Sequence, residues 1–439
     1  MSKFPIKRIR TLALVGQAGS GKTSLAEALL ARAGAIPAAG SVERGSTVCD
    51  YTPLEKSFKH SLKLAVASFE AQEHRIHLLD TPGYPDFLGH ALPALAAVET
   101  AAIVINAQNG IEMMTGRFMQ WAAKRGLDRL VIVNRIDAEN ADLPGLLEEI
   151  RQAFGKECLP LNLPAAAASK VSDCFFAPSG EADFSSVEEA HKRLVEQVVE
   201  VDERLMEVYL EKGEIPPDAL HEPLERAMRE GHLVPVVFTS AKTGAGIGEL
   251  LDVIVKLLPN PAEGNPPVYL NVPAEGGEAS EISALPDPGL HALAHVFKVE
   301  IDPYIGRLAV FRVHQGRITP GTQLFIGEGR KPIRAGHLYL LKGKTQVEVS
   351  EALPGDICAI AKIDEIQFDH ILHDSPGDAH IHARPLELPI AVFGLAVQPK
   401  KRGDEQKVSD VLHKLMAEDP CFRLEHNAQA NETVMRGIG

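Results

Sequence analysis

The sequence predicts an α/β protein: a mostly parallel sheet comes first, a β-barrel follows, and a smaller α+β unit comes last. Three observations support this fold class. Short apolar runs alternate with amphipathic stretches from residue 10 to about 258, as strands and helices of a parallel sheet do. Residues 259–290 are rich in proline and glycine, which marks a boundary. Short strand-like segments separated by glycine turns follow, and these are typical of a small barrel.

The boundaries of the units follow from the same pattern. We expect three units, over residues 1–270, 285–383 and 388–439. Between Asp137 and Ser240 the alternation of strands and helices breaks down, so residues 155–228 are predicted to form an inserted subdomain. One long charged helix is expected inside it, over about 185–213, because an amphipathic run there begins at a serine and ends at a glycine.

Composition excludes several classes of protein. The 439 residues are 45% hydrophobic and 24% charged, as in soluble globular proteins. A formal net charge of −14 argues against non-specific coating of nucleic acid, so any RNA partner must meet local basic patches such as 342–344 or 399–402. The five cysteines form no CxxC pair, which favours a reduced, cytoplasmic protein. No apolar run reaches the ~20 residues that span a bilayer, so no membrane partner is expected.

The stretch GQAGSGKT, residues 16–23, lies between a predicted strand and a predicted helix. It fits the phosphate-binding loop, in which backbone amides cradle phosphate oxygens at a helix N-terminus. Lys22 would reach the β- and γ-phosphates, and the Thr23 hydroxyl would bind Mg²⁺. The residues expected to contact nucleotide here are Gly16, Gln17, Ala18, Gly19, Ser20, Gly21, Lys22, Thr23 and Ser24.

The next motif is DTPG, which starts at Asp80 where the strand RIHLL ends. An acid at this place can hold Mg²⁺, usually through a water. Gly83 lacks a side chain, so its amide can approach a γ-phosphate and report its presence, as in nucleotide switches. With Lys22, we predict Gly83 and Tyr84 as the catalytic residues.

Two further strand ends carry base-recognition signals. In NRID, Asp137 can accept two hydrogen bonds from the edge of guanine, which adenine cannot offer, and Asn134 can tie the loop to the phosphate loop. Arg135 would lay its aliphatic stem along the base. In SAK, comprising Ser240, Ala241 and Lys242, the middle amide could bind the guanine oxygen. The pocket should therefore take GTP or GDP and reject adenine.

Together these stretches resemble the GTPase domain of the translation factors, and elongation factor G and its paralogues in particular. The insertion before SAK, the barrel segment 295–321 and the segment 395–427 look like that family in the same order. The resemblance implies Mg²⁺-dependent hydrolysis of GTP, a cytoplasmic monomer, and the ribosome as partner through its rRNA and stalk protein. In the family two more domains follow the third, and we expect this sequence to end within the third.

Two departures from the family pattern stand out. The family reads Arg-Gly-Ile-Thr in its first switch, where this chain has FKHS. Ser61 falls at the threonine position and is expected to bind Mg²⁺; the alternative is an ordinary strand-edge serine. His60 is expected to be exposed rather than catalytic. Elongation factor G has histidine after DTPG, where this chain has Tyr84. That tyrosine either serves the attacking water or packs against Phe87 or Leu88.

The sequence is also compatible with two other functions. One is a GTP-binding module that hydrolyses little or nothing and acts by occupancy, which Tyr84 and the altered first switch favour. The intact Lys22, Thr23 and Asp80 favour an enzyme. The other is a ribosome-protection factor of similar architecture, which the insertion and the barrel fit less well.

Overall fold

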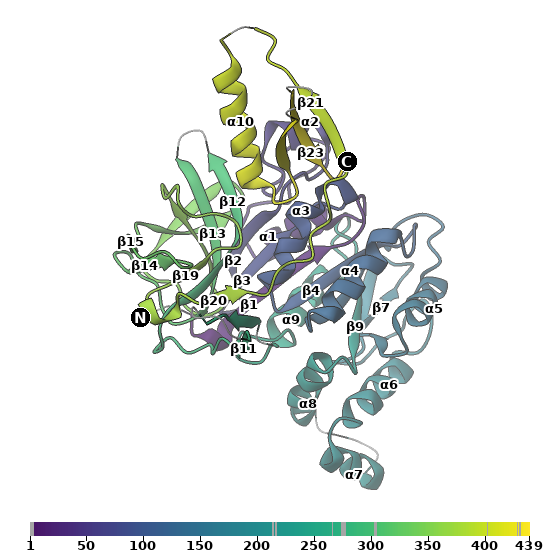
Figure 1. Cartoon of the computed structure of the whole chain (residues 1–439). Coiled ribbons are helices and arrows are strands. Elements are labelled where there is room, and N and C mark those ends of the chain that lie inside the picture. The colour runs from purple at the N-terminus through teal and green to yellow at the C-terminus, as the bar shows by residue number, and fades with distance from the viewer. Residues whose placement is uncertain are drawn as a thin grey trace.

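The computed structural model describes residues 4–212, 215, 217–265, 267–273, 278–302, 305–401, 403–427, 429 and 432–439. Figure 1 shows a helix-covered sheet in the middle, a group of strands beside it that carries the green colours, and the C-terminal helix and strands in yellow above them. The order of elements confirms the predicted fold class: α/β first, then β, then α+β. No helix among the described residues has the length and apolar character needed to cross a bilayer.

A mostly parallel sheet forms the centre of the first unit. In spatial order its strands are β2 (Ala65–Ala71), β3 (His74–Asp80), β1 (Ile9–Val15), β4 (Thr100–Asn106), β5 (Asp128–Asn134), β9 (Val234–Phe238) and β6 (Cys158–Pro160). Strand β2 runs antiparallel to β3, and the other pairs are parallel. Strands β1 and β4 are buried along their whole length, which explains why their sequences are apolar runs without alternation.

Helices connect these strands. The longer ones are α1 (Lys22–Arg32), α4 (Met113–Lys124), α5 (Leu143–Phe154) and α9 (Ile247–Lys256); the short ones are α2 (Pro53–Phe58), α3 (Leu88–Ala91) and the 3-10 turns η1 (Ile6–Arg8), η2 (Pro85–Phe87) and η3 (Leu92–Ala96). Because parallel strands end at the same edge of a sheet, the loops that follow β1, β3, β5 and β9 meet there. These are the loops that carry the motifs.

The inserted region corrects one expectation. It contains β7 (Asn162–Ala165), β8 (Lys170–Asp173), α6 (Val187–Val199), α7 (Glu203–Lys212) and α8 (Pro217–Arg229). The single helix predicted over 185–213 is therefore wrong, because the chain breaks between α6 and α7. The Asp202 carboxylate accepts the amides of Arg204 and Leu205, both at 3.1 Å, which starts a new helix. Arg226 of α8 holds the same carboxylate at 2.8 Å.

Antiparallel strands build the second unit around a core of its own. They are β12 (Leu293–Asp302), β13 (Gly306–Gln315), β14 (Gln323–Ile326), β15 (Ile333–Arg334), β16 (Leu338–Lys342), β17 (Thr345–Val349), β18 (Ile357–Ala361) and β19 (Ile371–His373). Val296, Phe311 and Ile360 are among the buried core side chains. A small sheet of β10 (Val268–Asn271), β11 (Ser280–Ser283) and β20 (Ile381–Ala383) lies alongside, and the 3-10 turn η4 (Pro376–Asp378) precedes β20.

Buried charges join the first two units. Arg75 of β3 donates to Asp356 at 2.9 Å, and Arg312 of β13 pairs with Glu99 in front of β4. Both pairs are almost fully buried, so loss of either partner would leave an uncompensated charge inside the protein. Lys342 of β16 also pairs with Ala67 of β2, so the strands of the two units form one continuous sheet.

The third unit contains β21 (Phe393–Val397), α10 (Glu405–Glu418), β22 (Arg423–Asn427) and β23 (Glu432–Gly437), with β23 in the middle of its sheet. Figure 1 shows α10 beside the end of β12. Glu418 makes that contact: it accepts the amide of Ile301 at 2.7 Å and the Lys63 ammonium at 2.8 Å. The third unit is thus attached both to the barrel and to the segment that precedes β2.

Candidate functional site

A cavity of about 1000 Å³ opens where the motif loops meet. Most of the predicted site residues line it, as do Asp50, His60 and residues 39–44, which come from the long connection between α1 and β2. Five predicted residues, Gly16, Gln17, Ser20, Asp80 and Ser240, do not line the cavity. They lie behind its wall: the amide oxygen of Gln17, for example, accepts the backbone amide of Met114 at 3.2 Å.

The phosphate loop wraps around a buried lysine. The Lys22 ammonium donates to the carbonyl oxygens of Gly16 at 3.0 Å and Gln17 at 2.9 Å. Gly16 has a φ of 136°, and a β-carbon there would come within 2.5 Å of the Val104 carbonyl oxygen, so glycine is required. Burial lowers the pKa of Lys22, although Asp80 opposes this shift. An anion bound in the loop would stabilise the charged lysine.

The three predicted metal ligands come together beside this loop. The Thr23 hydroxyl donates to Asp80 at 2.7 Å, and its oxygen lies 3.1 Å from the Ser61 hydroxyl. Ser61 reaches this place from a segment 38 residues further along the chain. The structure therefore places it beside Thr23 rather than at an uninvolved strand edge.

Asp50 is a member of this cluster that the sequence did not indicate. It is 3% exposed, it hydrogen-bonds Ser61, and its Oδ2 has no hydrogen-bond partner among the described residues. Oδ1 of Asp80 has none there either. Burial raises the pKa of Asp50 to about 6. Burial, and then repulsion from Asp50, raise the pKa of Asp80.

These donors fit a hard divalent cation. Two buried carboxylates with unfilled oxygens, together with two hydroxyl oxygens, are the ligand type that Mg²⁺ prefers. A buried carboxylate oxygen without a partner is costly, and a cation would remove that cost. The described residues contain no group of three or more His, Cys, Asp or Glu arranged for metal, so the hydroxyls are essential to the fit.

Carboxylates also hold the long connection that carries Asp50. Glu27 of α1 is 1% exposed and accepts the amides of Gly40 at 2.9 Å and Val48 at 2.6 Å. Glu55 caps α2 and accepts the amide of Leu62 at 3.1 Å. A glutamate inside a helix looks like any surface residue in the sequence, so no signal in the chain could have revealed Glu27 as an anchor.

The DTPG loop rests directly on the phosphate loop. The Ala18 amide donates to the Gly83 carbonyl at 3.1 Å, and a β-carbon on Gly83 would come within 2.5 Å of the Lys22 ammonium. Tyr84 is 41% exposed, and its ring centre lies 4.8 Å from that of His60, edge to face. Neither interpretation of Tyr84 included this partner. His60 is half-buried and lines the cavity, which differs from the exposed position expected for it.

The base-recognition motifs are connected by hydrogen bonds. The Asn134 side chain donates to the Ser20 carbonyl at 3.1 Å and accepts the Ala241 amide at 3.1 Å, so one residue joins three loops. The Ser240 hydroxyl donates to Asp137 at 2.6 Å, and the Lys242 ammonium lies 3.8 Å from the other oxygen of that carboxylate. Arg135 lines the same wall. A fixed carboxylate and a fixed amide thus face one end of the cavity.

Comparison with known proteins assigns the three units to known domain families. Residues 7–260 match the model of the elongation factor Tu GTP binding domain, residues 291–370 match elongation factor G domain 2, and residues 388–439 match elongation factor G domain III. These matches confirm the resemblance that the motifs indicated.

Individual relatives extend over nearly the whole chain. Two proteins of Mycobacterium tuberculosis, from strains CDC 1551 / Oshkosh and ATCC 25618 / H37Rv, are both described as elongation factor G-like protein. Each is 33% identical over 460 residues, covering 98% of this chain and 64% of the relative. A crystal structure of a protein from Thermus thermophilus superimposes with a TM-score of 0.84 at 34% identity, over 99% of this chain and 64% of that one. The chain therefore spans 64% of the length of these relatives.

Proposed function

Because this chain belongs to the translational GTPases, the family of the elongation factor Tu GTP-binding domain, we propose that it binds GTP with Mg²⁺ and hydrolyses it to GDP and phosphate. One observation carries the proposal. The phosphate loop, Thr23, Ser61 and the Asp137–Ala241 wall line a single cavity of about 1000 Å³, and Asp80 lies directly behind Thr23. A cavity built in this way can hold the phosphates, the metal and the base of one nucleotide together.

At the phosphate end, the loop amides and Lys22 would hold the β- and γ-phosphates. Thr23, Ser61 and Asp80 would hold Mg²⁺, and the nearby Asp50 would add negative charge. When bound, the metal neutralises charge that develops on the phosphate oxygens. In this account the raised pKa values of the two carboxylates fall again once a cation is present, because an opposite charge favours the ionised form.

At the other end, Asp137 would accept the two N–H groups of guanine, and the Ala241 amide would donate to the guanine oxygen. The Ser240 hydroxyl keeps the carboxylate oriented. Adenine would offer this carboxylate no N–H donor, so the lone pairs that face the base would stay unpaired. A buried group left unpaired costs about 1–3 kcal/mol, and more when it is charged, so the preference for guanine should be large.

Hydrolysis requires a water to attack the γ-phosphorus while the bond to the β–γ bridging oxygen breaks. The bond between the Ala18 amide and the Gly83 carbonyl would open first, because it occupies an amide of the phosphate loop that a γ-phosphate oxygen could accept from. Tyr84 contacts His60 in this state. We therefore propose slow hydrolysis by the protein alone and faster hydrolysis once a partner rearranges these residues.

The ribosome, through its rRNA and stalk protein, is the partner that we propose for a cytoplasmic, monomeric protein. This rests on the resemblance to elongation factor G and on the name of the Mycobacterium tuberculosis relatives, elongation factor G-like protein. The position of Tyr84 favours a second candidate function, a GTP-binding switch that acts by occupancy and hydrolyses little. The ribosome-protection factor has no such observation in its favour.

Single-turnover hydrolysis of γ-labelled GTP tests the proposal, with and without 70S ribosomes. We expect slow release of phosphate that ribosomes accelerate, and no release by Thr23→Ala, which loses a hydroxyl next to Asp80. Thr243→Ala is the matched control, since that residue lies in the loop after SAK. GTP that binds tightly but stays intact with ribosomes would establish the occupancy switch. Failure to bind GTP at all would overturn both candidates.

A further inference from the structure

A second cavity, of about 480 Å³, lies between the first unit and the barrel. None of its lining residues lines the nucleotide pocket. Its walls come from η3 and α4 on one side, from β12 and β13 on the other, and from the chain that follows β20. Its volume falls within the ~300–1,000 Å³ typical of small-molecule sites.

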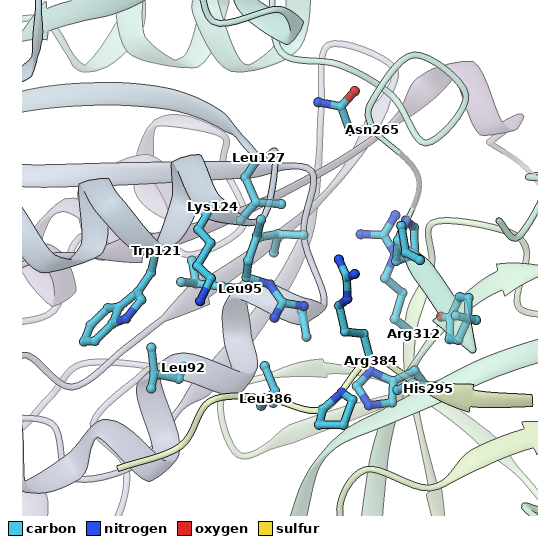
Figure 2. Close-up of a pocket in the computed structure, with 18 of the residues that line it drawn as sticks. Leu92, Leu95, Trp121, Lys124, Leu127, Asn265, His295, Arg312, Arg384 and Leu386 are labelled. Carbon is cyan, nitrogen blue, oxygen red and sulfur yellow. The ribbon is translucent and has the colours of Figure 1, made fainter. Parts of the chain in front are cut away.

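One half of this cavity is apolar. Figure 2 shows Trp121, Leu92, Leu95 and Leu386 gathered on one side of the space. The Trp121 ring is half-buried and packs edge to face on Phe118, with ring centres 5.3 Å apart, so its position is fixed. A flat apolar group could lie against this surface without displacing a polar partner.

The lining also carries an excess of positive charge. The cationic lining residues are Lys124, Arg125, Arg312 and Arg384; the anionic ones are Glu99 and Glu387. Four cations face two carboxylates in the lining, and Glu281 outside it pairs with Arg384 at 2.7 Å, which leaves one cation in excess in a chain whose formal net charge is −14. Figure 2 shows Arg312, Arg384 and His295 together, opposite the tryptophan.

Arg125 has the least compensated of these charges. Arg312 pairs with Glu99, Lys124 lies 2.6 Å from Glu387, and Arg384 lies 2.7 Å from Glu281. Among the described residues, by contrast, no carboxylate oxygen lies within 4.0 Å of the Arg125 guanidinium. An anion placed between Arg125 and Arg384 would give Arg125 the counter-charge that it lacks.

His314 supplies a second, independent sign of a missing ligand. Its side chain is buried, it lines the cavity, and its Nε2 has no hydrogen-bond partner among the described residues. Tyr269 packs on the ring with centres 5.6 Å apart. Burial, and then the charge of Arg312, lowers the pKa of His314, so the imidazole is neutral near pH 7. Buried polar atoms without partners are rare in native proteins and often point to a bound group.

We propose that this cavity binds a small organic anion with a flat apolar body. The anionic head would lie on the side of Arg125, Arg384 and His314, and the apolar body would lie against Trp121 and Leu386. Because the walls belong to two units, an occupant stabilises the arrangement in which they meet and raises the melting temperature of the chain. This inference is independent of the function proposed for the nucleotide pocket.

Trp121 makes the proposal testable, because it is the only tryptophan of the chain. The probe is 8-anilinonaphthalene-1-sulfonate, an aromatic anion that accepts energy from tryptophan, and excess GDP is present throughout to fill the nucleotide pocket. The neutral comparison is N-phenyl-1-naphthylamine, which lacks the sulfonate. We expect one site with energy transfer from Trp121, and binding of the anion about tenfold tighter than of the neutral compound.

Arg125→Gln is the decisive variant, because Arg125 is solvent-accessible and its replacement leaves the core intact. We expect it to weaken the anion about tenfold, to leave the neutral compound unchanged, and to abolish the rise in melting temperature. Arg334→Gln, at an exposed arginine of the barrel that does not line the cavity, should change nothing. Equal affinity for the two compounds, no binding, or the same result for both variants would overturn the proposal.

Discussion

The two halves of the nucleotide pocket are held in different ways. In one half, the loops that follow β1, β5 and β9 leave the edge of a buried sheet, and Asn134 bonds directly to two of them. In the other half, the segment from residue 34 to Ser61 is a long connection whose amides bond to single carboxylates such as Glu27. The first half is therefore preformed, whereas the second half can change its conformation by breaking only a few hydrogen bonds. A switch needs this difference.

The largest expected effect concerns the preformed half. Lys22→Ala should lower the affinity for GTP at least ~100-fold, because it removes a charge-assisted bond to phosphate that is worth about 3 kcal/mol. Titration with a fluorescent GTP analogue measures the loss. Lys212→Ala, on exposed α7, is the control. A loss below threefold in Lys22→Ala would mean that this loop does not bind phosphate.

The rebuildable half should respond to Glu27→Gln. The substitution places an amide group against the backbone N–H of Gly40 or Val48, so one donor loses its acceptor at a cost of about 1–3 kcal/mol. Hydrogen exchange over residues 40–48 should become about tenfold faster or more, while GDP affinity stays within about twofold. Glu249→Gln, in the first turn of α9, serves as the control. If exchange in this segment were unchanged, the anchoring role of Glu27 would be wrong.

The same contrast decides what the sequence could reveal. The phosphate loop, DTPG, NRID and SAK are short, and each follows a strand, so local pattern was sufficient to find them. Asp50, Glu27 and the contact of Tyr84 with His60 arise from pairings across the connection, with no spacing that a sequence could display. The break between α6 and α7 was missed for a related reason: Asp202 can cap a helix or lie on its surface, and Arg226 helps to decide which.

The barrel also holds the long connection between residue 34 and Ser61, through Glu300. Tyr51 donates to this carboxylate at 2.8 Å, and Lys298 does so at 2.8 Å. Burial alone would raise the pKa of Glu300, but Lys298 and Tyr51 hold it at about 2. Because this pKa lies below the ~4.3 of an unfolded glutamate, the contact stabilises the fold fully above pH ~5 and is lost as the pH falls towards 2.

Removing the tyrosine hydroxyl should weaken this link moderately. Tyr51→Phe is expected to lose about 1 kcal/mol of unfolding free energy at pH 7 and less at pH 3, where part of the stabilisation is already gone. Urea unfolding at the two pH values measures the difference. Tyr209→Phe is the control, since that hydroxyl makes only a 3.5 Å contact at the surface. An equal loss at both pH values would show that Glu300 does not titrate as described.

Tyr84 should give the smallest effect. Tyr84→Phe retains the ring that packs on His60 and removes a hydroxyl whose contribution is that of one hydrogen bond, so ribosome-stimulated hydrolysis should fall about two- to tenfold. The affinity for GTP should not change. Phosphate release under single-turnover conditions measures the rate, and Tyr339→Phe, on the barrel, is the control. An unchanged rate would show that the hydroxyl takes no part in hydrolysis.

The central claim is that the preformed half of the pocket recognises guanine through Asp137. Calorimetric titration of GDP, ADP and xanthosine diphosphate against the chain and against Asp137→Asn tests it most directly. We predict that the unchanged chain binds GDP at least ~100-fold tighter than the other two, and that Asp137→Asn prefers the xanthine nucleotide, whose ring accepts where guanine donates. Comparable affinities of the unchanged chain for GDP and ADP would contradict the account.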